Sequence, residues 1–324
     1  MIRFANENDI NDIMSFIDDY WKKGHILGVN KAFFEYEHLF PEGVSYVISR
    51  GQDEKINAIL GYIPYGKKNR DLMTVMWKAN HTAHSSLGLE LFKYLTDNGD
   101  IRMIASPGSN PKLKGLYKYF GYQFGKMLHW YRLRPQKTYQ IARIVDSEIP
   151  IVNNSTSFLF LNSWEALKSN FDFSNYKRET KPYKEAWYIK KRYFNHPIYN
   201  YDVYGLYDQS EKCSLLMIFR IISVNTINVV RLIDCIGDFS LIEKSAGLID
   251  YVLEKNQAEY VDCYEIGLSD DIMIKSGWKK REDSDNIIPN YFSPYLQENI
   301  DIYYFSSDSD VVLFKGDGDQ DRPN

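Results

Sequence analysis

The spacing of hydrophobic residues in the first part of the chain alternates between the periods of helices and strands. A short strand at the start leads into a helix whose apolar residues share one face: Ile10, Ile13, Met14, Ile17 and Trp21. Two β-rich runs, 44–50 and 56–66, flank the turn sequence GQDEK and predict a hairpin, and 72–80 predicts another strand. The pattern therefore predicts a mixture of helices and strands.

Two further helices follow, each leading into a strand. Residues 85–95 have helical spacing, with one face formed by Leu87, Leu91, Phe92 and Leu95. The strand 101–106 precedes a helix that Asn110 can cap and Gly121 can end, and 125–133 predicts a strand. Strands and helices thus alternate along the chain.

The second part of the chain repeats this order. The matching segments are 229–237 with 72–80, 246–255 with 89–98, 260–267 with 101–108, and 272–280 with 116–124. The stretch 134–157 between the two parts is polar and turn-rich, which favours a domain boundary. We predict an α/β protein with mixed sheets, in two similar domains covering 1–140 and 152–324. Chance similarity of α/β segments is the alternative.

Composition agrees with two globular domains and restricts the kind of partner. Of the 324 residues, 44% are hydrophobic and 25% charged, and no apolar run is long enough to cross a bilayer. The net charge of −4 without a dense basic patch argues against DNA. Because the start lacks the order of a signal peptide and the three cysteines form no close pair, we expect a cytoplasmic protein without membrane insertion. The 26 tyrosines could line a cleft for a sugar.

The first part resembles the GCN5-related N-acetyltransferase (GNAT) fold over most of residues 1–134. The most specific match is Asn110, six residues, Tyr117, three residues, then Gly121 and Tyr122, which is similar to the family signature N-x(6)-Y-x(3)-G-aromatic. This resemblance implies that Tyr117 is the general acid that protonates the departing CoA thiolate. A thiol pKa of about 8.5 and a phenol pKa of about 10 allow this transfer. A tyrosine that only packs in the core is the alternative.

A second match is Ala83–Gly88, which resembles the family's pyrophosphate loop Q/R-x-x-G-x-G/A. In such a loop, unpaired N–H groups at a helix N-terminus bind phosphate. Ser86 replaces the first glycine and Gly88 is retained, whereas Ala83 departs from the pattern. The resemblance implies acetyl-CoA or another acyl-CoA as co-substrate. The residues expected to bind it are Ser85, Ser86, Leu87, Gly88 and Asn110.

The second part lacks both signatures. Bulky Leu241, Ile242 and Glu243 stand where the loop should be, and Met273 replaces the tyrosine. This resembles tandem GNAT proteins, including the FemABX-like group, in which one copy keeps the catalytic features and the other shapes the substrate cleft. We expect the second part not to bind CoA.

Two segments of the second part carry candidate substrate-binding residues. His196 lies among aromatic residues and could act as a catalytic base, as could His84 and His129. The tail, residues 314–324, resembles those of GNAT-like proteins associated with bacterial surface-polysaccharide synthesis. The residues expected to contact the acceptor are Tyr199, Tyr201, Asp319, Arg322 and Asn324. The alternate aspartates of the tail lack the distal glutamate of a calcium loop, so we expect no metal.

The function predicted from these features is an acyl-CoA-dependent N-acyltransferase. At pH 7 an amine of pKa about 8 is freed of its proton for roughly 1.4 kcal/mol, against roughly 4.6 kcal/mol for a lysine. Since no carboxylate base is evident in 72–80, a small acceptor such as a nucleotide-linked amino sugar is favoured over protein lysine. The alternatives are FemABX-like transfer of an amino acid from aminoacyl-tRNA, and a non-catalytic binding module.

Overall fold

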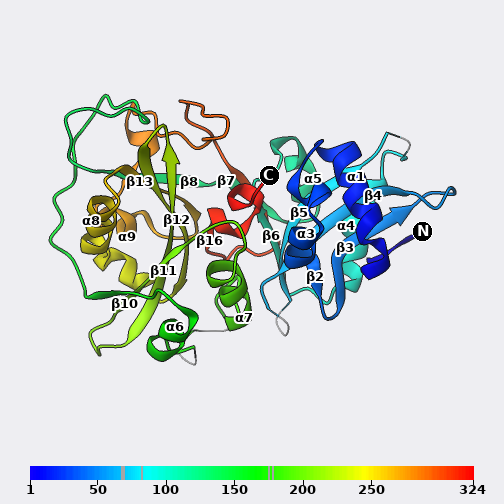
Figure 1. Ribbon diagram of the computed structural model, residues 1–324, viewed down its shortest axis with the longest axis horizontal. Coiled ribbons are helices and arrows are strands. Elements are labelled where there is room, and N and C mark those ends of the chain that lie inside the picture. The colour runs from blue at the N-terminus through cyan, green and yellow to red at the C-terminus, as the bar shows by residue number, and fades with distance from the viewer. Residues whose placement is uncertain (67–69, 82, 174–175, 177–178) are drawn as a thin grey trace.

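The first part of the chain forms a mixed sheet of eight strands (Figure 1). The computed structural model describes residues 1–66, 70–81, 83–173, 176 and 179–324. The strand order is β1-β3-β4-β5-β6-β15-β7, with β2 paired to β3; β5 and β6 run parallel, and the other neighbours antiparallel. The strands are β1 Ile2–Ala5, β2 Leu39–Phe40, β3 Gly43–Arg50, β4 Ile56–Pro64, β5 Asp71–Ala79, β6 Met103–Pro107, β7 Gln123–Lys126 and β15 Tyr303–Ser306.

Helices cover both faces of this sheet. Ile13 and Phe34 pack with Tyr46 of β3 on one face, whereas Leu91 packs with Val47 on the other. Successive strand residues point to opposite faces, which explains this division. The helical segments are η1 Glu7–Asp9, α1 Ile10–Phe16, η2 Ile17–Trp21, α2 Ile26–Val29, α3 Lys31–His38, α4 Leu87–Asn98, η3 Pro111–Leu113 and α5 Lys114–Tyr119.

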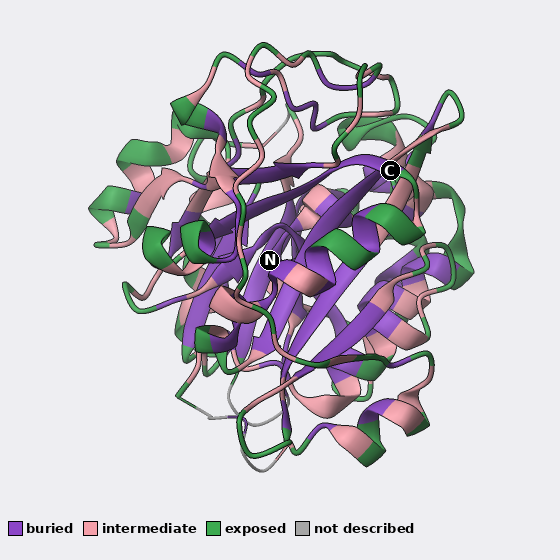
Figure 2. Ribbon diagram, turned by 90° about the vertical axis from the view of Figure 1, so that its left-hand side faces the viewer, coloured by how far each residue is buried: buried purple, intermediate pink, exposed green. Residues whose placement is uncertain are grey.

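The second part forms another mixed sheet of eight strands, in the order β14-β8-β13-β12-β11-β10-β9, with β16 paired to β13. Here β12 and β13 are the parallel pair. The strands are β8 Leu128–Leu133, β9 Phe158–Phe160, β10 Asp202–Tyr207, β11 Cys213–Val224, β12 Ile227–Gly237, β13 Ala258–Ile266, β14 Lys279–Lys280 and β16 Leu313–Phe314. The helical segments are α6 Trp164–Asn170, α7 Ala186–Ile189, η4 Lys190–Phe194, η5 Phe239–Lys244, α8 Ala246–Lys255, α9 Asp270–Lys275, η6 Arg281–Asp283, η7 Lys315–Asp317 and η8 Asp319–Asp321. The strands of both sheets are largely buried (Figure 2).

The two sheets have corresponding topologies, so the predicted fold class and internal repeat are confirmed. In both, the parallel pair follows an antiparallel pair that contains a bulge, between β4 and β5 and between β11 and β12. Gly121 after α5 and Gly277 after α9 have φ of 76° and 83°. Because non-glycine residues rarely adopt this left-handed conformation, both glycines end their helices as expected.

One strand of each sheet comes from the other part of the chain. The predicted strand 125–133 is interrupted at Met127: β7 joins the first sheet, and β8 inserts between β13 and β14 of the second. In return, β15 inserts between β6 and β7 of the first sheet. The halves therefore share strands across the predicted boundary, and each sheet is complete only with the other half present.

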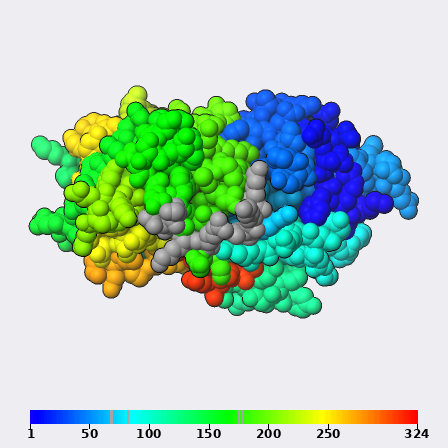
Figure 3. All heavy atoms as spheres, turned by 90° about the horizontal axis from the view of Figure 1, so that it is seen from below, coloured from blue at the N-terminus to red at the C-terminus, as the bar shows by residue number. Residues whose placement is uncertain are grey.

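The end of the chain lies between the two halves (Figures 1 and 3). A Cβ on Gly318 would lie 2.1 Å from the carbonyl oxygen of Pro107, and one on Gly108 would lie 2.6 Å from Asp319 Oδ1. These close approaches show that the tail is packed against β6 rather than extended into solvent. Among the described residues, no helix is long and apolar enough to cross a lipid bilayer.

The strand exchange predicts that Phe305 of β15 stabilises the first half. Its side chain is buried, and its ring stacks on Tyr117 with 4.0 Å between centroids. Phe305→Ala should lower the free energy of unfolding by about 3–5 kcal/mol, since it removes a large core side chain. Denaturant unfolding measures this effect. The control Leu159→Ala, at an exposed position on β9, should change stability by less than about 1 kcal/mol. Equal stability of both variants would contradict the prediction.

Candidate functional site

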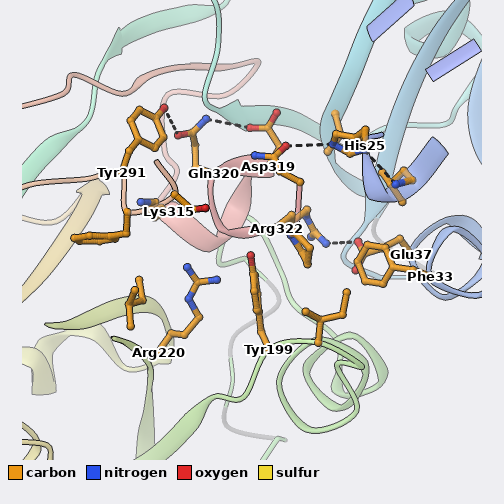
Figure 4. Close-up of a pocket in the computed structure, with 18 of the residues that line it drawn as sticks. His25, Phe33, Glu37, Tyr199, Arg220, Tyr291, Lys315, Asp319, Gln320 and Arg322 are labelled. Atoms are coloured by element: carbon orange, nitrogen blue, oxygen red, sulfur yellow. Dashed lines mark hydrogen bonds and ion pairs between the residues drawn. The ribbon is translucent and has the colours of Figure 1, made fainter. Parts of the chain in front are cut away.

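A cavity of about 740 Å³ lies between the two halves (Figure 4). Its walls come from both sheets and from the end of the chain. The first half contributes a group that includes His25, Phe33, Glu37, His38, Val75 and Met76, and the second half one that includes Tyr199, Arg220, Arg231, Asn290 and Tyr291. The end of the chain contributes Lys315, Asp319, Gln320, Arg322, Pro323 and Asn324.

The cavity reaches the middle of β5, where this strand separates from β6. Parallel pairing ends at Met73 opposite Ala105, and the Thr74 carbonyl instead accepts a hydrogen bond from Ser106 Oγ at 2.9 Å. Met76, in the bulge, has φ of 33° and lines the cavity. Beyond Met73, β5 has no strand partner on this side among the described residues. Its free backbone groups can therefore bind an extended ligand.

The predicted phosphate loop follows β5 and leads into α4. Trp77 Nε1 donates to the Gly88 carbonyl at 3.0 Å, and a Cβ on Gly88 would lie 3.2 Å from that nitrogen. The backbone N–H groups of Gly88 and Leu89 have no acceptor among the described residues. The start of α4 can therefore hold an anion, and a side chain larger than glycine at position 88 would crowd Trp77.

Side chains of this loop mainly serve the local structure. Ser86 Oγ donates to Glu90 Oε1 at 2.9 Å and lies 3.1 Å from His84 Nδ1. Leu87 is buried in the core of the first half, whereas Ser85 is exposed. Any phosphate bound here would therefore interact mainly with backbone N–H groups.

Tyr117 packs in the core of the first half, and the cavity lining does not include it. Its ring lies between Phe305 and Phe124, with centroid distances of 4.0 and 5.9 Å. Burial raises the pKa of Tyr117, an effect that Ser109 partly opposes. The phenol therefore keeps its proton at neutral pH. Asn110 has the capping role expected from its position, since its Oδ1 accepts from the Lys112 N–H at 3.0 Å.

His196 lies behind the wall of the cavity, where its ring stacks on Tyr199. Nδ1 accepts the backbone N–H groups of Ile198 and Tyr199, at 3.1 and 2.9 Å. Burial and the guanidinium groups of Arg192 and Arg322 lower the pKa of His196 to about 3. A neutral ring whose Nδ1 accepts must carry its proton on Nε2, so no lone pair remains to take up a proton. This geometry does not support a base role for His196.

Four of the five predicted acceptor-binding residues line the cavity: Tyr199, Asp319, Arg322 and Asn324. The fifth, Tyr201, is turned away from it and donates to Asp321 Oδ2 at 2.8 Å.

Several of these side chains are held by hydrogen bonds (Figure 4). Arg322 pairs with Glu37, and Asn324 Oδ1 lies 3.2 Å from His25 Nε2. Gln320 links Tyr291 to Asp319, at 3.3 Å on each side. The end of the chain is therefore an ordered wall of the cavity.

The histidines that line the cavity are His25 and His38, which the sequence interpretation missed. His25 Nδ1 accepts the Leu27 N–H at 3.2 Å, so its Nε2 carries the proton. His38 Nδ1 lies 2.8 Å from Ser45 Oγ. Of the predicted bases, His84 is exposed beside α4, and His129 is buried in the second sheet, 3.2 Å from Asp262 Oδ2. His25 is the N-cap residue of α2 and His38 is the last residue of α3, and neither position gave a local signal of a cavity.

In the second half, the space that corresponds to the open edge of β5 is filled by the tail. Pairing of β12 with β13 ends at Leu232 opposite Cys263, and β16 then pairs with the end of β13. A Cβ on Gly316 would lie 2.8 Å from the Ile233 side chain. At the start of α8, the Gly247 N–H already donates to Ser155 Oγ at 2.9 Å. The first half could bind CoA through an open strand edge and free N–H groups at a helix start. In the second half, the protein's own residues occupy both places.

The position of His196 predicts an acid-sensitive contribution to stability. Its folded pKa of about 3 lies below the ordinary value of 6.5, so protonation favours the unfolded chain as the pH falls below 6.5. Between pH 7 and pH 5, His196 should cost up to about 2 kcal/mol of stability. His196→Asn keeps an acceptor for the two N–H groups but does not titrate.

The unfolding free energy of this variant should therefore fall less between pH 7 and pH 5 than that of the wild type. Denaturant unfolding at both pH values measures the difference, with exposed His84→Asn as the matched control. Identical pH dependence of wild type and His196→Asn would show that folding does not lower the pKa of His196.

Comparison with known proteins gives a match in structure alone. No protein-family model and no curated protein matches the chain. A putative acetyltransferase from Pyrococcus horikoshii is 12% identical, with a TM-score of 0.51, covering 96% of this chain and 90% of that one. A probable N-acyltransferase from Enterococcus faecalis V583 is 10% identical (TM-score 0.58; 94% and 71% covered). A GCN5-related N-acetyltransferase from Anabaena variabilis ATCC 29413 is 11% identical (TM-score 0.55; 94% and 72%). The chain therefore has the fold of these acetyltransferases, arranged as two GNAT-like halves.

Proposed function

We propose that the protein is an acyl-CoA-dependent N-acyltransferase whose first half binds the acyl-CoA. The observation that carries this proposal is the asymmetry between the parallel strand pairs. The edge of β5 beyond Met73 is open beside the cavity, whereas the tail fills the corresponding space beside β12. The likeness in fold to solved acetyltransferases supports the acyltransferase assignment.

The acyl-CoA would extend along β5 from the loop to the cavity. The Gly88 and Leu89 N–H groups are free to bind a pyrophosphate, which the N-terminal end of the α4 dipole also favours. The amide groups of a pantetheine chain can hydrogen-bond to the free edge of β5. This arrangement would bring the thioester near Met76, where the strand edge opens into the cavity.

The reaction needs one nucleophilic attack and two proton movements. The acceptor nitrogen attacks the thioester carbonyl carbon, the C–S bond breaks, the nitrogen loses a proton and the sulfur gains one. We propose Tyr117 as the donor to the sulfur because of its match to the N-x(6)-Y-x(3)-G-aromatic signature; its phenol is protonated at neutral pH, and its ring lies in the core outside the cavity lining, so the thiolate would have to approach it from β5. Holding the amine beside the thioester, together with a backbone N–H on the carbonyl oxygen, would supply most of the acceleration.

The acceptor would occupy the cavity between the halves. The hydroxyl of Tyr199 and the side chains of Asp319 and Asn324 offer polar groups to a sugar, whereas His196 and Arg220 cover the Tyr199 ring. A nucleotide-linked amino sugar, as used in surface-polysaccharide synthesis, is the acceptor that we propose. His38 is the candidate base: when its Nδ1 donates to Ser45, the Nε2 lone pair is free to take the amine proton. Burial lowers the pKa of His38, so it is neutral near pH 7.

Calorimetric titration with acetyl-CoA and with a longer acyl-CoA tests this proposal. One saturable site per chain is expected for the acyl-CoA that the enzyme uses. Turnover is then measured with nucleotide-linked amino sugars by the release of free thiol. Absence of CoA binding would refute the proposal, and binding without amino-sugar turnover would refute only the acceptor.

Gly88→Leu should weaken acyl-CoA binding at least tenfold, because its side chain would crowd Trp77 and cover the N–H groups at the start of α4. Gly115→Leu is the matched control, since a Cβ at Gly115 meets no atom within 4 Å. Calorimetry on both folded variants measures the difference. Wild-type affinity in Gly88→Leu would place the CoA phosphates elsewhere.

Tyr117→Phe should lower kcat by about ten- to a hundredfold while acyl-CoA affinity stays unchanged, because the ring remains and only the proton donor is lost. Tyr122→Phe, in the same cluster of rings, is the control and should retain wild-type kcat. The measurement requires conditions in which acyl transfer limits the rate. If both variants turn over like the wild type, Tyr117 is only a packing residue.

A further inference from the structure

The wall of the cavity has an excess of basic side chains. Five basic residues line it, against two acidic residues, Glu37 and Asp319. The basic residues are Lys22, Arg220, Arg231, Lys315 and Arg322. This excess makes the cavity favourable for a negatively charged ligand unless carboxylates behind the wall neutralise it.

Two of these cations are neutralised by the protein itself. Arg322 pairs with Glu37. Arg231 makes a two-pronged ion pair with Asp262, with Nε and Nη2 each 2.8 Å from a carboxylate oxygen. Neither residue therefore needs a ligand to balance its charge.

Lys315 has no carboxylate partner among the described residues. Its side chain is buried, and Nζ donates to the amide oxygen of Asn290 and lies 5.5 Å from the centre of the Tyr264 ring. The Nδ2 of Asn290 is also buried and has no hydrogen-bond partner. Burial and the neighbouring Arg231 lower the pKa of Lys315 well below its ordinary value. Two buried donor groups thus stand side by side without an anionic acceptor.

Arg220 shares its carboxylate with another arginine. It lies 2.9 Å from Asp321 Oδ1, but Oδ2 of the same carboxylate accepts from Arg192 and from Tyr201, at 2.8 Å each. One negative charge therefore serves two guanidinium groups. Nε and Nη1 of Arg220 are buried without a well-formed hydrogen bond, and the guanidinium lies 4.1 Å from the centre of the Tyr199 ring.

These incompletely neutralised groups lie in one region of the cavity. Figure 4 shows Arg220 extending from β11 toward Lys315, with Tyr199 beside it. We propose that Lys315, Arg220 and Asn290 form a subsite for an anionic group of the acceptor, a phosphoryl or a carboxylate group. The assignment to the acceptor rests on the proposed acyltransferase function, whereas the anion subsite itself follows from the charges and unpartnered donors.

The chemistry of these three side chains suits such a group. A guanidinium offers two parallel N–H donors to a phosphate or carboxylate, and an ammonium adds a point charge. The Asn290 amide can donate to a further oxygen. The subsite also differs from the proposed CoA phosphate site, because the loop at Ser85–Gly88 does not contribute to the lining of this cavity.

The test compares anion binding to the full-length protein and to four variants. Inorganic phosphate and acetate are the probes, and binding is measured by calorimetry and by the concentration-dependent rise in Tm. Lys315→Met and Arg220→Gln should each weaken binding at least tenfold. Lys22→Met removes another lysine of the cavity wall, one that is exposed, and should leave binding unchanged.

Asn290→Asp tests whether a loss of phosphate binding can occur without misfolding. The new carboxylate would pair with Lys315 inside the protein, so Tm without ligand should not fall, while phosphate binding should be lost. The probe that binds more tightly identifies the anionic group as phosphoryl or carboxylate. If Lys315→Met and Arg220→Gln bind phosphate and acetate as tightly as the wild type does, the proposed subsite is wrong.

Acetyl-CoA titration of the same variants separates this proposal from the proposed function. Unchanged acetyl-CoA affinity in Lys315→Met and Arg220→Gln, with weaker phosphate binding, supports a subsite for the acceptor. A parallel tenfold loss of acetyl-CoA affinity would assign these residues to CoA and overturn the proposal. If wild type binds phosphate through Lys315 but binds no acyl-CoA, the anion subsite stands and the proposed acyltransferase fails.

Discussion

The ion pairs of Lys184 with Asp234 and Asp317 hold the end of the chain inside the second half. Lys184 Nζ lies 2.5 Å from Asp234 Oδ1 and 2.7 Å from Asp317 Oδ1, with all three side chains buried. Buried charges of this kind are stable only when paired, so the lysine fixes the turn of the tail against β12. Two carboxylates share one ammonium, and burial raises the pKa of Asp234 to about 6. The hydroxyl of Tyr193 donates to Asp234 Oδ2 and offsets part of this cost.

The location of the cavity depends on this anchored tail. Once Lys315–Asp317 occupies the space beside Ile233, the following residues cross to the first half and meet Gly108 and Glu37. They close one side of the cavity and leave the edge of β5 open on the other. The same segment therefore fills the opening of one half and lines the cavity beside the other, so two halves of similar topology present different surfaces.

The strand exchange ties the two halves together through several crossings of the chain. The chain passes directly from β7 of the first sheet to β8 of the second, and it returns to the first sheet for β15 before β16 pairs with β13. The cavity lies at this interface, where a thioester bound on β5 and an amine held between the halves could meet. Arg220 of the second half lines the same cavity as Val75 and Met76 of β5, and the proposed anion subsite would orient the acceptor by its charged end.

The sequence by itself determined several helices and strands of the first half and their repetition in the second. Helical spacing located α4, the capping residue Asn110 starts η3, and Gly121 and Gly277 end their helices, because these features depend on neighbours a few residues away. Asp319 and Arg322, which the sequence suggested as ligand contacts, line the cavity, and their contact with a ligand stays a prediction.

Only the tertiary structure decided which sheet each strand joins and which side chains face the cavity. A run such as 125–133 has strand-like residues whether it continues one sheet or crosses to another, so local pattern could not reveal the exchange at Met127. His38 and Lys315 likewise resemble ordinary residues of a helix and a loop. They line the same cavity because the chain brings residues almost three hundred positions apart together, and packing between distant segments, rather than local periodicity, determines that meeting.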